Sequence, residues 1–265
     1  MSAGTLGSMG RGTTPAGRMA ALARAEVTLL GRSKGTLFAA MFVPLALPFS
    51  MRSAAEEMDL KEAGLSIGTV VLPAALGVSL LFAVYTTLVG VFVARREELV
   101  LKRLRTGELR DVEILTGSAL PAVVTGVVQS AVLAVGCAVL LDVAPPRAAH
   151  YVVAGYLLGV VMCAALAAVT ASWSRSTESA QVTTMPFILL SLTGSGLVVP
   201  LEVMPDRLAS VCEVLPLTSV ITLLRGGWNG SLTAGEALTA LVTALAWTAA
   251  AVFAVRRWFR WEPRR

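Results

Sequence analysis

Six long stretches of the chain contain no Asp, Glu, Lys or Arg, and the charged residues are collected between them. A helix crosses the ~30 Å hydrocarbon core of a bilayer with about 20 apolar residues, within a range of roughly 17–25. The stretches are 35–51, 63–94, 114–141, 148–174, 179–201 and 237–255, with 17, 32, 28, 27, 23 and 19 residues. Each is therefore long enough to cross. We predict an all-α integral membrane protein with six transmembrane helices, at about 35–51, 67–94, 114–141, 150–173, 180–200 and 234–255.

The composition supports this fold class and excludes others. Charged residues make up 15% of the 265, against about 25% in soluble domains, and mean hydropathy is +0.74. Such a chain is too apolar to be disordered, and three cysteines are too few for a disulfide scaffold. The net charge is +5, but the basic residues lie in clusters between uncharged runs rather than on one soluble face. We therefore expect no nucleic-acid partner.

The distribution of Lys and Arg sets the expected orientation. If all six stretches cross, 17 of the 22 basic residues lie on the side that carries both termini and 5 lie on the other. If the first stretch does not cross, the division is 12 against 10. Because Lys and Arg favour the cytoplasmic side, we expect six spans with both termini in the cytoplasm. Residues 1–17 are expected to be a flexible tail, 18–258 a single transmembrane domain and 259–265 a basic tail.

None of the six uncharged stretches contains a carboxylate, Lys or Arg, which a proton pump or secondary transporter needs at membrane depth. His150 is the only histidine, so no metal site is expected, and we find no set of catalytic groups. Polar residues within the spans are hydroxyls and amides, including Gln129, Ser130 and Thr170, which we expect to bond across helices or to their own backbone. Gly155 and Gly159 form a small-xxx-small pattern that allows close helix packing.

An amphipathic segment, 18–34, precedes the first expected span. Arg24 and Arg32 face away from an apolar stripe, whereas Glu26 falls within the stripe and is expected to have a basic partner. A helix of this kind lies in the headgroup layer. The pattern fits a plain membrane anchor or an element that contacts a partner protein.

The segment 95–113 concentrates six basic and five acidic residues after the second span. Val100, Leu101 and Leu104 form a narrow apolar ridge between the charges, suited to docking in a groove of a soluble partner. A solvated loop is the alternative. The candidate contact residues are Arg95, Arg96, Glu97, Glu98, Lys102, Arg103, Leu104 and Arg105.

The segment 202–230 lies between the last two expected spans and is divided by Pro205 and Pro216 into pieces too short to cross. We expect short helices that fold back at the outer leaflet, with Glu202 and Arg225 at the headgroups. The segment is either a lid over a path or a covering loop.

In these residues the chain resembles the membrane subunit of ABC-2 type exporters, from about Arg24 to Trp258. Three stretches carry the resemblance: 32–48 at the first span, 95–98 with 102–106 after the second, and 194–200 with Met204-Pro205, Pro216-Leu217-Thr218 and Arg225 near the sixth. Their order around six spans is the specific part of the pattern.

The resemblance implies two such subunits, a homodimer being favoured over a heterodimer, with two copies of a separate ATPase that binds ATP and Mg. This chain has no Gly-x-x-x-x-Gly-Lys-[Ser/Thr] phosphate loop, so no cofactor of its own is expected. By the same resemblance, 95–110 holds the helix that couples to the ATPase, 18–34 the interface helix, and 202–225 the outer re-entrant helices. The expected cargo is drug-like, lipidic or a natural product, exported through a bacterial plasma membrane. A polysaccharide or peptide cargo and a non-transporting scaffold are the alternatives.

Overall fold

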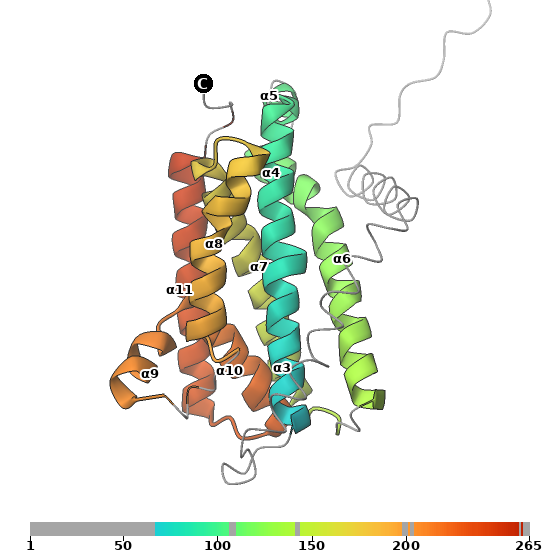
Figure 1. Cartoon of the computed structure of the whole chain (residues 1–265), viewed down its shortest axis with the longest axis vertical. Helices are drawn as coiled ribbons and strands as arrows, with labels where there is room; N and C mark the ends of the chain where they lie inside the picture. The colour runs from blue at the N-terminus through green and yellow to red at the C-terminus, as the bar shows by residue number, and fades with distance from the viewer. Residues whose placement is uncertain are drawn as a thin grey trace, which may run out of the picture.

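The computed structural model describes residues 67–105, 110–140, 144–197, 201, 204–259 and 261. The expected first span 35–51, the tail 1–17, the interface-helix residues Arg24, Glu26 and Arg32, and Glu202 lie outside these residues. Within them the structure is helical and contains no strand (Figure 1). The elements are α3 (Ile67–Ser79), the π-helix η1 (Leu80–Thr86), α4 (Thr87–Glu97), α5 (Val100–Arg105), α6 (Asp111–Leu140), α7 (Ala149–Trp173), α8 (Thr177–Gly194), α9 (Asp206–Glu213), α10 (Pro216–Asn229) and α11 (Ala234–Trp258).

Four helical segments among the described residues are long and apolar enough to cross a membrane: Val71–Glu97, Asp111–Val139, Ala149–Trp173 and Ala234–Trp258. They correspond to four of the six expected spans. The fifth expected span, 180–200, corresponds to α8, an 18-residue helix that is not among the four. Helices α9 and α10 meet at 98° and count as a further crossing only if the bent pair is one span. Six spans therefore stay a prediction.

Local sequence explains several helix ends. Ser176 and Thr233 begin α8 and α11 with reciprocal capping boxes, in which the side chain of each cap accepts a backbone N–H three residues on. Pro216 begins α10 at a position where a missing N–H costs nothing. Gly230 ends α10 in the left-handed conformation that glycine adopts without strain.

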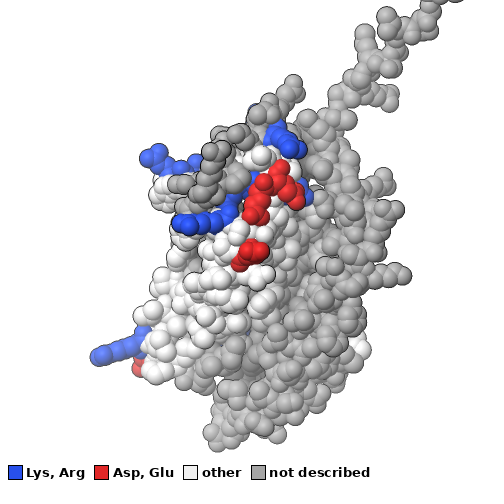
Figure 2. Space-filling view, turned by 45° about the horizontal axis from the view of Figure 1, so that its top comes forward, with Lys and Arg blue, Asp and Glu red and all other residues white. Residues whose placement is uncertain are grey.

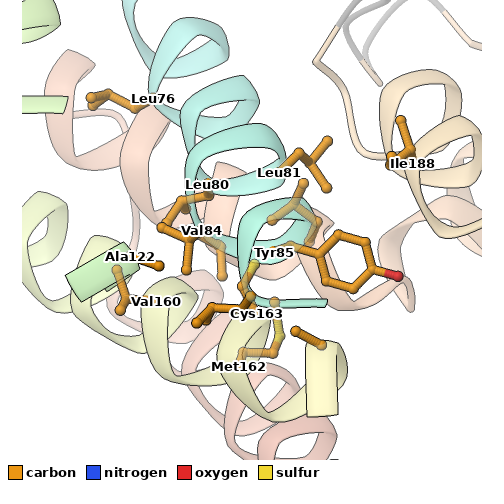
Figure 3. Packing of buried hydrophobic residues seen from close by; sticks show 14 of the residues in the cluster. Leu76, Leu80, Leu81, Val84, Tyr85, Ala122, Val160, Met162, Cys163 and Ile188 are labelled. Atoms are coloured by element: carbon orange, nitrogen blue, oxygen red, sulfur yellow. The ribbon is translucent and has the colours of Figure 1, made fainter. Parts of the chain in front are cut away.

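The core forms where α7 packs against η1, α10 and α11. Leu80 and Val84 of η1 lie near Val160 and Cys163 of α7 in this core, whereas Leu81 lies on the side of Ile188 of α8 (Figure 3). Gly155 and Gly159 confirm the expected close approach: a Cβ on Gly155 would lie 2.7 Å from Leu223 Cβ, and one on Gly159 would lie 2.8 Å from Leu80 Cδ1. Helix α11 packs through small residues, with Ala237, Ala240, Ala244 and Ala251 buried at helical spacing.

Charge divides the bundle into two unlike ends. At one, which we call the charged end, lie the ends of α4, α7 and α11, all of α5, and the starts of α6 and α8 (Figure 1). Nine basic residues of the described chain belong to this end: Arg95, Arg96, Lys102, Arg103, Arg105, Arg110, Arg175, Arg256 and Arg257. The opposite end, with α9 and α10, has Arg147, Arg207 and Arg225.

Candidate functional site

The charged segment after the second expected span forms a sharp elbow between α4 and α5, here defined as residues 95–105. Helix α4 ends at Glu97, and Leu99 adopts φ 59° before α5 begins at Val100. The left-handed conformation costs a residue other than glycine about 1 kcal/mol or more, so surrounding contacts must hold the bend. Hydrogen bonds from Leu99 N to Arg96 O and from Arg103 N to Leu99 O, of 3.1 and 3.0 Å, connect the two helices through it.

Arg96 anchors the elbow in the bundle. Its side chain is 1% exposed, and its guanidinium donates to the carbonyl oxygens of Ala171 (2.8 Å) and Ser174 (2.5 Å) at the end of α7. A helix leaves its last carbonyls without partners and carries partial negative charge there. A buried arginine is stable only where such acceptors compensate for its lost hydration. The guanidinium of Arg96 therefore lies away from any partner surface and fixes α4 to α7.

Glu97, which follows the positively charged Arg96 in the chain, contacts the start of α8 through its negative charge. The Glu97 carboxylate accepts a hydrogen bond from Thr177 N at 3.3 Å, at the first residue of α8. The start of a helix carries partial positive charge, so an anion there is favourable. Arg96 and Glu97 thus complement two helix ends of opposite polarity, and the elbow is fastened to both sides of the α7–α8 turn.

The remaining candidate contact residues differ in their access to solvent. Glu98 and Arg103 are exposed and Arg95 is half-buried. Lys102, Leu104 and Arg105 belong to α5, but their side chains lie outside the described part. The prediction that Leu101 belongs to an exposed apolar ridge is wrong, since Leu101 is 0% exposed. The left-handed turn at Leu99 precedes a helix that directs Leu101 into the bundle and leaves Arg103 exposed.

The opposite end contains the short helices expected between the last two spans. Pro205 is the N-cap of α9 and Pro216 begins α10, so both prolines act as helix starts. Arg225, expected at the headgroups, is 9% exposed and donates through Nη2 to Gly196 O at 2.6 Å, and its depth in a membrane stays a prediction. Because α10 packs against α3, α7 and α11, its arginine points into the bundle beside the end of α8.

Ser130 bonds across helices as expected, in a hydroxyl cluster whose other members, Ser79 and Tyr156, sequence reasoning did not predict. Ser130 of α6 donates to Ser79 Oγ at 2.9 Å, and Tyr156 of α7 donates to Ser130 Oγ at 2.7 Å and to Gly126 O at 3.0 Å. Its position is adjacent to the start of η1, and π-helical turns occur often at functional sites. The sequence signalled only that hydroxyls were present, because no spacing in a single helix predicts which hydroxyls of other helices meet them.

Gln129 is an exception among these polar groups. It is 1% exposed, and neither Oε1 nor Nε2 has a hydrogen-bond partner. Thr170, in contrast, bonds to Tyr85 and to its own helix, as expected. The described residues contain no group of three or more His, Cys, Asp or Glu placed to hold a metal ion.

Comparison with known proteins gives one positive result. No curated protein matches the chain. A family model described as ABC-2 type transporter matches residues 18–228, which include the elbow, the helices from α3 to α9 and most of α10. The match covers most of the 265 residues and agrees with several apolar helices long enough to cross a membrane. The chain belongs to the ABC-2 type transporter family and is a multi-pass membrane protein, the membrane component of an ABC transporter.

Proposed function

We propose that this chain is the membrane subunit of an ATP-driven exporter and that the elbow docks on a separate ATPase. The observation that carries this proposal is the anchoring of the elbow: Arg96 and Glu97 fasten it to the α7–α8 turn, while Glu98 and Arg103 remain exposed. A displacement applied to the exposed charges is therefore passed directly to α7 and α8. A solvated loop would need no such anchoring.

The excess of basic residues at the charged end supports a cytoplasmic location for that end. With the six expected spans, both termini are then cytoplasmic, and an ATPase can approach the elbow. The working assembly has two permease subunits, identical in the simplest case, and two ATPase subunits that bind ATP and Mg. In this proposal the complex exports its cargo through a bacterial plasma membrane.

The described spans suit an amphipathic cargo. Their polar groups are hydroxyls and amides such as Ser79, Gln129 and Tyr156, which offer hydrogen bonds without a fixed charge. We propose a drug-like, lipidic or natural-product molecule. Export of a polysaccharide or peptide uses the same architecture, and a non-transporting scaffold is the other candidate.

The docking role is tested by reversing exposed charges of the elbow in the double variant Glu98→Arg/Arg103→Glu. Like charges brought together at an interface cost several kcal/mol, so we expect co-purification of ATP-hydrolysing activity with the tagged chain to fall at least about tenfold. Membrane insertion should persist, because both side chains are exposed. Unchanged recovery of the ATPase with this variant contradicts the docking role.

The matched control reverses two exposed charges at the opposite end, Arg207→Glu/Glu213→Arg on α9, which should leave ATPase recovery unchanged. Transport and scaffolding are separated with the intact complex in membrane vesicles. An exporter accumulates a fluorescent amphipathic dye only when ATP is supplied on the side of the elbow. Solute movement by this chain alone, without nucleotide, contradicts the proposed energy source.

A further inference from the structure

The ends of α7 and α11 share features that the docking proposal does not use. Both helices have 25 residues, both run toward the charged end, and they pack against each other (Figure 1). Each ends in an exposed tryptophan: Trp173 is 62% exposed and Trp258 is 60% exposed. Tryptophan is enriched at the level of lipid headgroups, so the two rings mark the membrane–water boundary at this corner of the bundle.

Three arginines belong to the ends of these two helices. Arg175 follows α7 by two residues, and Arg256 and Arg257 belong to the last turn of α11. All three are exposed, and in the described part of the chain their guanidinium groups form neither a hydrogen bond nor an ion pair. The bond recorded for Arg175 uses its backbone N–H, which donates to Ser179 Oγ. We call Trp173, Arg175, Arg256, Arg257 and Trp258 the α7–α11 corner.

The carboxylates of the charged end belong to other helices than α7 and α11. Glu97 and Glu98 end α4, and Asp111 and Glu113 begin α6. Glu178, in the first turn of α8, is the acid nearest to Arg175 in sequence and forms no ion pair with it. In Figure 2, several basic side chains gather at the left of the charged end, and the acidic ones lie to their right together with further basic side chains. Among the described residues, the corner thus combines three arginines and contains no carboxylate of its own, with Glu97 and Glu178 at the neighbouring start of α8.

We propose that the α7–α11 corner binds the headgroup of an anionic phospholipid of the phosphatidylglycerol type. Arginine forks donate paired hydrogen bonds to phosphate oxygens, and basic sites between transmembrane helices bind anionic headgroups. The apolar surface below supports a lipid rather than a soluble anion. Phe253 is exposed one turn before the arginines and packs edge-to-face against Trp258, with ring centroids 6.4 Å apart, which gives an acyl chain an aromatic surface.

The test is native mass spectrometry of the purified full chain with equal amounts of phosphatidylglycerol and phosphatidylcholine. We expect wild-type protein to retain phosphatidylglycerol at least about fivefold over phosphatidylcholine, since each arginine near the headgroups adds to the attraction. Arg256→Gln/Arg257→Gln should lower this ratio, and the triple variant with Arg175→Gln should bring it close to one. Equal retention of both lipids by wild type overturns the proposal, as does a triple variant that keeps the preference.

A matched control replaces two exposed arginines of the opposite end, Arg147→Gln/Arg207→Gln, and should keep the wild-type ratio. If the triple variant fails to fold, wild type in 0.5 M NaCl replaces it: screening should reduce the preference, and an unchanged ratio overturns the proposal. Millimolar glycerol 1-phosphate should not displace the lipid. If glycerol 1-phosphate displaces the lipid, the corner is a soluble-phosphate site instead. If the triple variant loses the ATPase but keeps its lipid preference, the corner is a protein-docking site. Both results overturn lipid binding without bearing on the elbow.

Discussion

The guanidinium of Arg96, near the end of α4, donates a 2.8 Å hydrogen bond to the carbonyl oxygen of Ala171 in the last turn of α7. A second bond reaches Ser174 O, just beyond that helix. One buried side chain therefore satisfies two carbonyls that a helix end leaves without intrahelical donors. This relationship makes the elbow a fixed extension of the bundle, although it consists of charged residues.

Replacing Arg96 should destabilise the whole chain. In Arg96→Gln, the shorter amide loses the charge and cannot reach both carbonyls, so we expect the free energy of unfolding to fall by roughly 2 kcal/mol, as for a lost hydrogen bond to a charged group. The thermal midpoint of the purified protein in detergent measures this. Arg96→Lys should recover part of the loss, and exposed Arg175→Gln should change little. A wild-type midpoint for Arg96→Gln would show that the anchor contributes nothing.

Helix α8 is held at both ends by side chains that match its dipole. The Glu97 carboxylate accepts from Thr177 N at its start, and Arg225 donates to Gly196 O just after its end. Along its length the buried residues are mostly small, including Ala180, Ser191 and Gly194. The charged contacts therefore act at the two ends of an 18-residue helix about 27 Å long, while Ile188 and Phe187 pack into the core between them.

Hydrogen exchange should reveal these end contacts separately. Glu97→Gln removes the anion at the start of α8, so amides in its first turn should exchange several-fold faster, because favourable interactions with the helix dipole act within one turn. Arg225→Gln should instead accelerate exchange around Gly194 and Gly196. Neutralising Glu98, which has no recorded contact with α8, is the control for the first effect. Equal exchange in Glu97→Gln and wild type would mean that the Thr177 contact does not hold the helix.

Two glycine-to-alanine substitutions should change stability in opposite directions, one through close packing and the other through helix propensity. A Cβ on Gly159 would lie 2.8 Å from Leu80 and 2.9 Å from Val220, so Gly159→Ala forces a shift that costs about 1–3 kcal/mol. Gly117 of α6 has nothing within 4 Å of that position, and Gly117→Ala should stabilise the helix by up to about 1 kcal/mol. Thermal midpoints should move in opposite directions. A Gly159→Ala protein as stable as wild type would contradict the close approach of α7 to η1 and α10.

Apolar substitutions of Gln129 and Ser130, which are adjacent in α6, should shift the thermal midpoint in opposite directions. Gln129 is buried without partners for its amide, so Gln129→Leu removes a desolvation penalty of roughly 1–3 kcal/mol and should raise the thermal midpoint. Ser130→Ala breaks the bonds to Ser79 and Tyr156 and should lower it. A lower midpoint for Gln129→Leu would show that the amide has a partner in the folded protein.

Much of the helical framework was predictable from charge placement. The starts and ends of α6, α7 and α11 lie within about three residues of the expected spans, because a bilayer core excludes charges and sets the length of the apolar run. Pro205 and Pro216 correctly predicted the starts of α9 and α10. The count of six spans depends on residues 35–51 and on α8, and it stays a prediction.

The candidate site was predictable in location but not in the roles of its residues. The concentration of charge marked 95–105, yet Arg96 is an internal anchor and Leu101 is buried. Arg225, expected at the headgroups, is also buried. The π-helix η1 had no sequence signal that we identified.

What the sequence alone determined is where helices run and where charge accumulates, since both depend on the order of residues along one chain and on the apolar solvent around it. Only the tertiary structure decided that Arg96 and Glu97, adjacent in sequence, complement opposite ends of two helices about 80 residues away. The physical reason is that a buried charge is stabilised by particular acceptors and dipoles, and their positions are set by how the helices pack.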